Sequence, residues 1–292
     1  MKITYRNIAA TALAGALLCG TAACSAESAE PAADRKSDDG KAAAKTVEMS
    51  PVAAVEKATA NNKGLTSLTY SMSGEIPGEG QIEADAALGL KPLVVQMKMR
   101  MKVDGKQEEV EVRLSEGGLY LNGGKEAAAE MDGKSWMKFP IDPSGKGSSA
   151  AGLPSQFDQN PAEESASLTA AEDLKKVGEE TVDGVATTHY TGTLTLAELR
   201  ESLKDETDAK AKKRREEGLK EYEDMGVDKL TMDMWIDKSD LTKQFRIKGA
   251  AKKGPLDLTI KFLAYNKPVT VKAPPASETV DLSEMMEGAQ AG

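Results

Sequence analysis

The sequence contains very few of the residues on which common catalytic sites depend. Its 292 residues include two cysteines, Cys19 and Cys24, and a single histidine, His189. Ser-His-Asp, Cys-His and His-ligated zinc sites are therefore all disfavoured. Acidic residues are plentiful, but no motif pairs two carboxylates, and a hydrolase that uses only carboxylates stays open as an alternative. We predict a protein that is not an enzyme and has no catalytic residues, metal site or cofactor.

Aromatic residues and positive charge are also scarce. Aromatics make up 4% of the chain, too few for the stacking platforms usual in sugar-binding receptors. The chain has 38 basic and 47 acidic residues, a formal net charge of -9, and no basic domain. This balance argues against nucleic acid as a partner.

The N-terminus is typical of an exported lipoprotein. Lys2 and Arg6 precede an uncharged apolar run over residues 8–18, and small residues then lead to Cys24. The run is too short to span a bilayer, and this order of regions predicts a signal peptide over residues 1–23. Cys24 has the position of a lipidated cysteine, whose acyl chains (palmitate, for example) would anchor the protein to the outer, extracytoplasmic face of the cell membrane. Ordinary cleavage that leaves a soluble secreted protein is the alternative.

Composition divides the rest of the chain into three parts. Residues 24–46 hold the lipidated cysteine and a flexible tether, which lacks large apolar residues and cannot pack. Residues 47–275 are predicted to form one domain, and residues 276–292 a loose acidic tail. Because Cys19 lies in the signal peptide and Cys24 is lipidated, the domain has no thiol for a disulfide, and its stability must come from an apolar core.

Hydrophobic periodicity predicts a domain made mostly of strands. The clearest strand is Leu93–Val103, where alternate residues are apolar. Ser50 and the proline after it predict the start of a helix, and residues 161–176 and 196–225 are predicted to be helical. The sum is an α+β fold: a large curved antiparallel sheet of about 9–11 strands, an open half-barrel, with helices that cover its concave face.

Methionines gather on one face of two predicted strands. Their flexible, polarizable side chains suit a cavity that adapts to varied acyl chains. The candidate cavity-lining residues are Met97, Met99, Met101, Leu230, Met232, Met234 and Ile236. Ordinary core packing against the helices is the alternative explanation of the same pattern.

Two polar features of the sequence can each be interpreted in two ways. His189 lies within a strand pattern, and we interpret it as a structural residue rather than as a site. The densest basic run, residues 212–215, is interpreted as a solvated helix face. Contact with anionic lipid headgroups is the alternative for this run.

Two segments resemble known lipoproteins. The segment from Gly178 to Gly192 is similar to the central hairpin of actinobacterial LppX/LprG-type lipoproteins, which share a LolA-like fold, and residues 234–245 resemble the next hairpin of that group. The order of elements over residues 47–273 is similar as well. The resemblance implies an open antiparallel half-barrel closed by helices, without catalytic residues. It also implies an apolar cavity for acylated lipids or glycolipids that move from the inner membrane towards the envelope.

The predicted function is therefore that of an envelope lipoprotein. It would bind the acyl chains of a lipid, glycolipid or lipoprotein in an apolar cavity and carry them across the cell envelope. Its partners would be the membrane, through Cys24, and an acylated cargo. The alternative is a regulatory or scaffolding module that binds another envelope protein, because similar domains also serve as periplasmic sensors.

Overall fold

A computed structural model of the chain describes residues 49–103, 106–115, 118–139, 161–204 and 209–282. The predicted signal peptide, Cys24 and almost all of the tether lie outside these residues, so their assignment stays a prediction. Within the described part of the chain, no helix combines the length and the apolar character that a membrane span requires.

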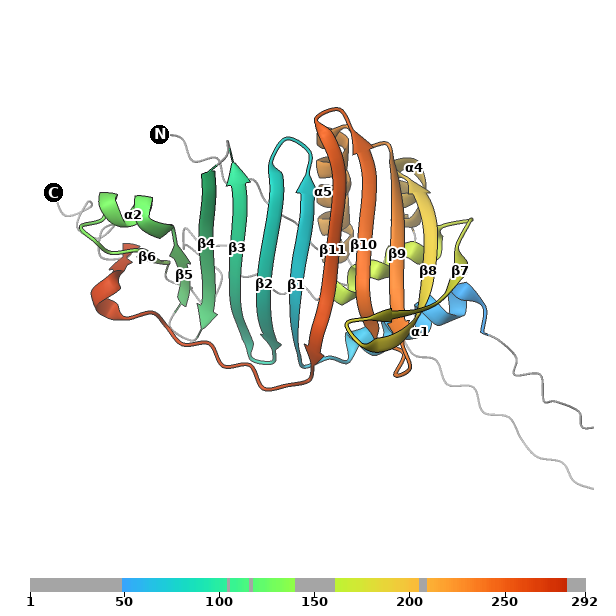
Figure 1. Ribbon diagram of the computed structural model, residues 1–292, viewed down its shortest axis with the longest axis horizontal. Coiled ribbons are helices and arrows are strands. Elements are labelled where there is room, and N and C mark those ends of the chain that lie inside the picture. The colour runs from blue at the N-terminus through green and yellow to red at the C-terminus, as the bar shows by residue number, and fades with distance from the viewer. Residues whose placement is uncertain (1–48, 104–105, 116–117, 140–160, 205–208, 283–292) are drawn as a thin grey trace, which may run out of the picture.

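The described strands form one unclosed sheet (Figure 1), in the order β12-β6-β5-β4-β3-β2-β1-β11-β10-β9-β8-β7. Neighbouring strands run antiparallel, except that β12 is parallel to β6. The predicted class, a large antiparallel sheet with a few helices, is confirmed, with slightly more strands than expected. The strands are β1 (Ser67–Ile76), β2 (Gly80–Leu90), β3 (Leu93–Val103), β4 (Lys106–Ser115), β5 (Gly118–Asn122), β6 (Trp136–Phe139), β7 (Lys175–Val182), β8 (Val185–Thr195), β9 (Lys229–Asp237), β10 (Thr242–Ala251), β11 (Gly254–Tyr265) and β12 (Thr279–Asp281).

The helices partly follow the predicted pattern. The first begins after Ser50, whose side chain accepts a hydrogen bond from the Ala53 amide at 3.2 Å, as the N-cap signal predicts. The predicted helix over residues 196–225 is two helices, α4 and α5. The helical elements are α1 (Pro51–Lys63), α2 (Gly124–Glu130), η1 (Pro161–Ala170), α4 (Leu196–Ser202), α5 (Ala209–Met225) and η2 (Ala276–Glu278).

The prediction that residues 161–176 are helical holds for residues 161–170 and is wrong for the rest. The segment forms the 3-10 helix η1 and then enters β7. The hydroxyls of Ser165 and Thr169 donate to carbonyls three residues earlier, at 2.8 and 2.7 Å, and so compete for acceptors within the helix. Beyond η1, the Asp173 carboxylate accepts the Thr193 amide at 2.6 Å and ties the chain to β8.

One face of the sheet is apolar across almost its whole width. Side chains that lie directly opposite each other in antiparallel strands share a face, so the register identifies which residues lie together. One row of such partners crosses eight strands, from β4 to β8: Val110, Met99, Ala84, Met72, Ile260, Phe245, Met234 and Tyr190. Every member is apolar or aromatic, which makes this face continuous.

The larger helices cover only part of this apolar face. In Figure 1, α1, η1, α4 and α5 lie behind β8–β11, and no described helix lies behind β2 and β3. The packing is tight where helices are present: a Cβ added to Gly192 on β8 would lie 2.7 Å from the Ala171 Cβ. The expectation that helices cover the face therefore holds for one part of the sheet.

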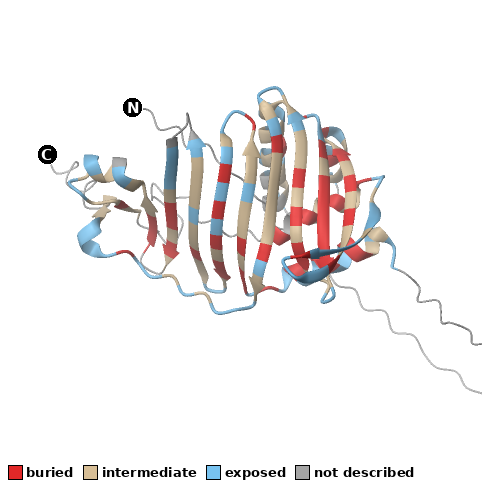
Figure 2. Ribbon diagram, viewed as in Figure 1, coloured by how far each residue is buried: buried red, intermediate tan, exposed pale blue. Residues whose placement is uncertain are grey.

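Burial follows this division only in part. Buried residues are most frequent on β9, but β2 also has many, whereas β3 is mostly intermediate (Figure 2). The side chains of Phe245 and Phe262 are 1% exposed. The core of the domain lies between the helices and β8–β10 and continues over the neighbouring strands, where Leu68, Leu88 and Val112 belong to the same cluster.

Two further segments extend over or beside the sheet. The turn at Asp183 and Gly184 has φ values of 48° and 81°, which confirms the predicted hairpin between β7 and β8. Its tip lies over the face opposite the helices, where the Asp183 carboxylate accepts a hydrogen bond from Lys261 on β11 at 2.9 Å. At the other edge, β12 pairs with β6, so the tail predicted to be loose is ordered over its first residues.

Candidate functional site

The seven candidate cavity residues lie on the same face of the sheet but in two different environments. Leu230, Met232, Met234 and Ile236 on β9 are at most 5% exposed and form part of the core. Met97, Met99 and Met101 on β3 are only partly buried. Four strands, β2, β1, β11 and β10, separate the two groups. The structure therefore does not bring the two sets together in one enclosed cavity.

The partly buried set belongs to a wider apolar area, which we name the methionine surface. It consists of apolar side chains of intermediate exposure on β1, β3, β4 and β11, whereas other apolar side chains of these strands, such as Val95 and Val112, are buried. Between its longer side chains, β2 contributes the small residues Ala84 and Ala86, which are 1% and 6% exposed. The methionine surface consists of Met72, Met97, Met99, Met101, Val110, Leu258 and Ile260.

The opposite face of the sheet carries a polar cluster around His189. The imidazole Nδ1 lies 2.8 Å from a carboxylate oxygen of Glu180, and Nε2 lies 3.1 Å from one of Asp233. The ring stacks on Trp235, with centroids 4.2 Å apart, and the Trp235 indole N–H donates to Glu180 at 2.7 Å. These contacts join β7, β8 and β9 on the face away from the helices and give His189 a structural role.

The polar cluster gives the fold an expected dependence on acid. Hydrogen bonds from Trp235 and then His189 lower the pKa of Glu180. Burial by itself raises the pKa of Asp233, but hydrogen bonds from Thr191, Lys248 and His189 outweigh it, so that this pKa is lowered overall. Both carboxyls bind protons less readily in the folded than in the unfolded chain. Their stabilisation is complete above the unfolded pKa of about 4 and is lost as the pH falls through the folded values.

We therefore expect the thermal midpoint to fall as the pH is lowered from about 5 to about 3. The variant Asp233→Asn removes one of the two carboxyls and should show a shallower fall, measured by circular dichroism melting at each pH. An equally steep fall in this variant would show that Asp233 does not contribute to the acid dependence.

A groove of about 320 Å³ lies between α4 and α5. A capping box fixes the start of α4, because Thr195 accepts the Glu198 amide while the Glu198 carboxylate accepts the Thr195 amide. The groove combines an apolar base with charged walls. Its lining residues are Arg200, Leu203, Lys204, Lys212, Glu216, Leu219, Lys220 and Glu223.

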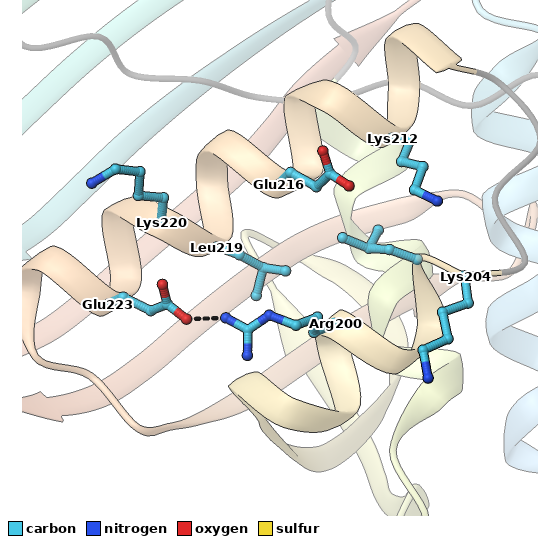
Figure 3. A pocket seen from close by; sticks show the side chains of 8 residues that line it. Arg200, Lys204, Lys212, Glu216, Leu219, Lys220 and Glu223 are labelled. Carbon is cyan, nitrogen blue, oxygen red and sulfur yellow. Dashed lines mark hydrogen bonds and ion pairs between the residues drawn. The ribbon is translucent and has the colours of Figure 1, made fainter.

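We name this space the helix groove, and its charged side chains are distributed along its length (Figure 3). Lys204 and Lys212 lie near one end, and Arg200 donates to Glu223 at the other end. Lys220 points away from α4 and pairs with Asp224 at 2.8 Å. Lys204 pairs with Glu201 at 2.6 Å. No ion pair between two described residues involves Lys212.

A smaller apolar crevice of about 90 Å³ adjoins the helix groove. Leu203 and Leu219 line both spaces. From these leucines the crevice reaches Met232 on β9 and Ile247 on β10, which belong to the apolar face of the sheet. The groove and the sheet are thus connected through apolar side chains.

Sequence reasoning found only part of this site. Of the basic run over residues 212–215, Lys212 lines the groove and Arg215 lines the crevice, whereas the side chain of Lys213 is 77% exposed. Arg200 and Lys204 were missed because they join Lys212 only when α4 packs against α5. The hydrophobic pattern of the helices does not specify this packing. Over the described residues, no three His, Cys, Asp or Glu side chains are arranged to hold a metal ion.

Comparison with known proteins places the chain in a family. A family model described as a family of unknown function (DUF6612) matches residues 52–248. An uncharacterized 31.2 kDa protein of Streptomyces griseus is 32% identical over 194 residues, which cover 64% of this chain and 61% of that protein. A protein of Streptomyces coelicolor named as a candidate lipoprotein is 25% identical over 180 residues, which cover 61% of this chain and 53% of that protein. The matched part thus spans little more than half of each relative.

A solved structure adds a likeness of fold. The lipoprotein LppX of Mycobacterium tuberculosis is 17% identical, with a TM-score of 0.44, over 76% of this chain and 98% of LppX. The Streptomyces coelicolor relative is thus named as a candidate lipoprotein, in agreement with the predicted resemblance to actinobacterial lipoproteins.

Proposed function

The chain belongs to the DUF6612 family, and we propose that it is a lipid-anchored envelope protein that binds and carries acyl chains without catalysing a reaction. Cys24 holds it on the outer face of the cytoplasmic membrane, and residues 25–46 let the domain stand away from the bilayer. The acyl chains of a lipid, a glycolipid or another lipoprotein are its cargo.

The observation that carries this proposal is the continuation of the apolar face beyond the helices. Helices bury the part on β8–β10, where Met234 is 0% exposed, but Met97, Met99 and Met101 remain partly exposed on β3. Contact between an acyl chain and these side chains removes apolar area from water and gains about 25 cal/mol per Å². Methionine adapts its shape to the chain that it meets, which favours varied cargo over one fixed ligand.

The test is to place a charge on the methionine surface. The full chain, purified from its own envelope in a mild detergent, should carry a noncovalent lipid that native mass spectrometry detects in addition to the anchor. We expect Met99→Lys to lose most of this lipid, because a lysine disrupts the apolar contact, while its melting temperature stays close to that of the unchanged protein. Met99 is partly exposed, so a lysine there can extend its ammonium into water.

A matched control uses the other face of the same sheet. Ser73→Lys adds the same charge at an exposed position of β1, where Ser73 pairs with Glu83 and Thr259 on the polar face, and it should leave the lipid bound. A protein that carries no lipid and takes up none when it is offered would contradict the proposal. That result would favour a module that binds another envelope protein.

A further inference from the structure

The helix groove gathers positive charge in a chain that is acidic overall. Four of its eight lining residues are basic and two are acidic, but Lys220 points away from α4 and is neutralised by Asp224. The remaining lining charges give a local balance of 3 - 2 = +1, whereas the whole chain carries -9. Lys204 and Lys212 lie together near one end of the groove in Figure 3. An anion of low molecular weight finds a favourable local potential there in spite of the overall charge.

The ion pairs that line the groove are easily exchanged. The side chains of Arg200 and Glu223 are 58% and 44% exposed, and those of Lys204 and Glu201 are 67% and 69% exposed. Exposed pairs of this kind contribute little to stability, because water and salt screen them. An incoming anion can therefore replace Glu223 or Glu201 as a partner at small cost.

The base of the groove indicates what kind of anion fits. Leu203 and Leu219 form an apolar base that also belongs to the crevice leading to Met232 and Ile247. A small hydrophilic anion would leave these side chains without an apolar partner. An amphiphile with an anionic head and an acyl chain matches both the charged walls and the apolar base.

We propose that the helix groove between α4 and α5 binds the phosphate headgroup of an anionic phospholipid whose acyl chain enters the adjoining crevice. Arg200, Lys204 and Lys212 contact the phosphate, and Leu203 and Leu219 contact the first methylene groups. The crevice has a volume of about 90 Å³ and takes only the end of a chain. This inference rests on the proposed function, since it names the class of lipid that the protein prefers.

The test compares two lipids that differ only in the headgroup. The purified full chain in detergent is offered equal amounts of phosphatidylglycerol and phosphatidylcholine with identical acyl chains, and native mass spectrometry measures the ratio bound. We expect a preference for phosphatidylglycerol of about fivefold or more, which corresponds to one lysine–headgroup attraction. The double variant Lys204→Glu, Lys212→Glu should lower this ratio to about one. It should weaken phosphatidylglycerol, whose headgroup has a net negative charge, much more than phosphatidylcholine, whose phosphate is offset by the choline cation.

The control variant lies one residue further along the same helix. Lys213 points into solvent and lines neither space, so Lys213→Glu changes the charge of α5 without touching the groove and should keep the preference. Lys212→Gln, a milder change, should show an intermediate ratio if the double variant fails to fold. Equal binding of the two lipids by the unchanged protein, or loss of the preference in Lys213→Glu, overturns the headgroup inference while the carrier proposal stands. Absence of any bound lipid in every form contradicts the proposed function instead.

Discussion

Replacement of Met234 by alanine is expected to lower the free energy of unfolding by ~2–5 kcal/mol, the usual cost of truncating a fully buried methionine. The Met234 side chain is 0% exposed and lies between Phe245 and Tyr190 on the neighbouring strands. Truncation leaves a cavity that these close-packed neighbours fill only in part. Urea unfolding followed by tryptophan fluorescence measures the loss, because Trp235 lies next to Met234 in the same strand.

Met99→Ala is the matched comparison, since it makes the same chemical change in the same row of the sheet. Met99 is partly exposed, and less apolar area is lost on truncation, so we expect a cost of about 1 kcal/mol or less. The contrast between the two variants tests the division of the apolar face into a covered and an uncovered part. Equal losses of unfolding free energy in the two variants would mean that Met99 is packed as tightly as Met234 in solution. Met99 would then not be available to contact a lipid, which would contradict the proposed binding surface.

The strands could be predicted because their signals are local. The strand Leu93–Val103 alternates apolar and polar residues from Val95 onwards, and β3 has the predicted bounds. The turn at Asp183 and Gly184 has residues that accept positive φ, so its hairpin was also predictable. Periodicity even placed the seven candidate residues on one face, because alternation fixes the face within each strand.

What could not be predicted depends on contacts between distant segments. The alternation on β3 and on β9 is alike, yet Met99 is partly exposed and Met234 is buried, because the helices cover only one end of the sheet. On the first helix, Val52 is 40% exposed although it is apolar, while Ala54 and Ala58 are buried together with Val55. Small residues carry a weak hydrophobic signal, although their size is what allows α1 to approach its neighbours closely.

The helix groove shows the same limit for a candidate site. The run over residues 212–215 attracts attention because its charges are adjacent in sequence, but adjacent helical residues point in different directions. Of this run, only Lys212 joins Arg200 and Lys204 in the groove; Arg200 lies on α4 and Lys204 just beyond its end. A charge pattern in sequence thus locates a basic helix without revealing which of its charges act together.

Cys24→Ser is expected to abolish the lipidation of the protein, which is the largest functional effect of any change proposed. The thiol is the acceptor of the lipid, and serine has the same shape without the nucleophilic sulfur. Two acyl chains are enough for stable anchoring, at about 0.8 kcal/mol for each buried CH₂. The net charge of -9 gives no attraction to an anionic membrane that could replace them.

Cys19→Ser supplies the control, because the two cysteines lie five residues apart in the same N-terminal segment. Cells that express each variant are grown with a palmitate analogue that carries a reactive tag, and the tag is detected on the purified protein. We expect incorporation to be unchanged in Cys19→Ser and absent in Cys24→Ser. If the palmitate analogue were still incorporated in Cys24→Ser, Cys24 would not be the lipidated residue, and the proposed anchor at this position would be wrong. The domain would then have to reach its cargo as a freely diffusing protein, and the acidic chain would have to approach the membrane against its own charge.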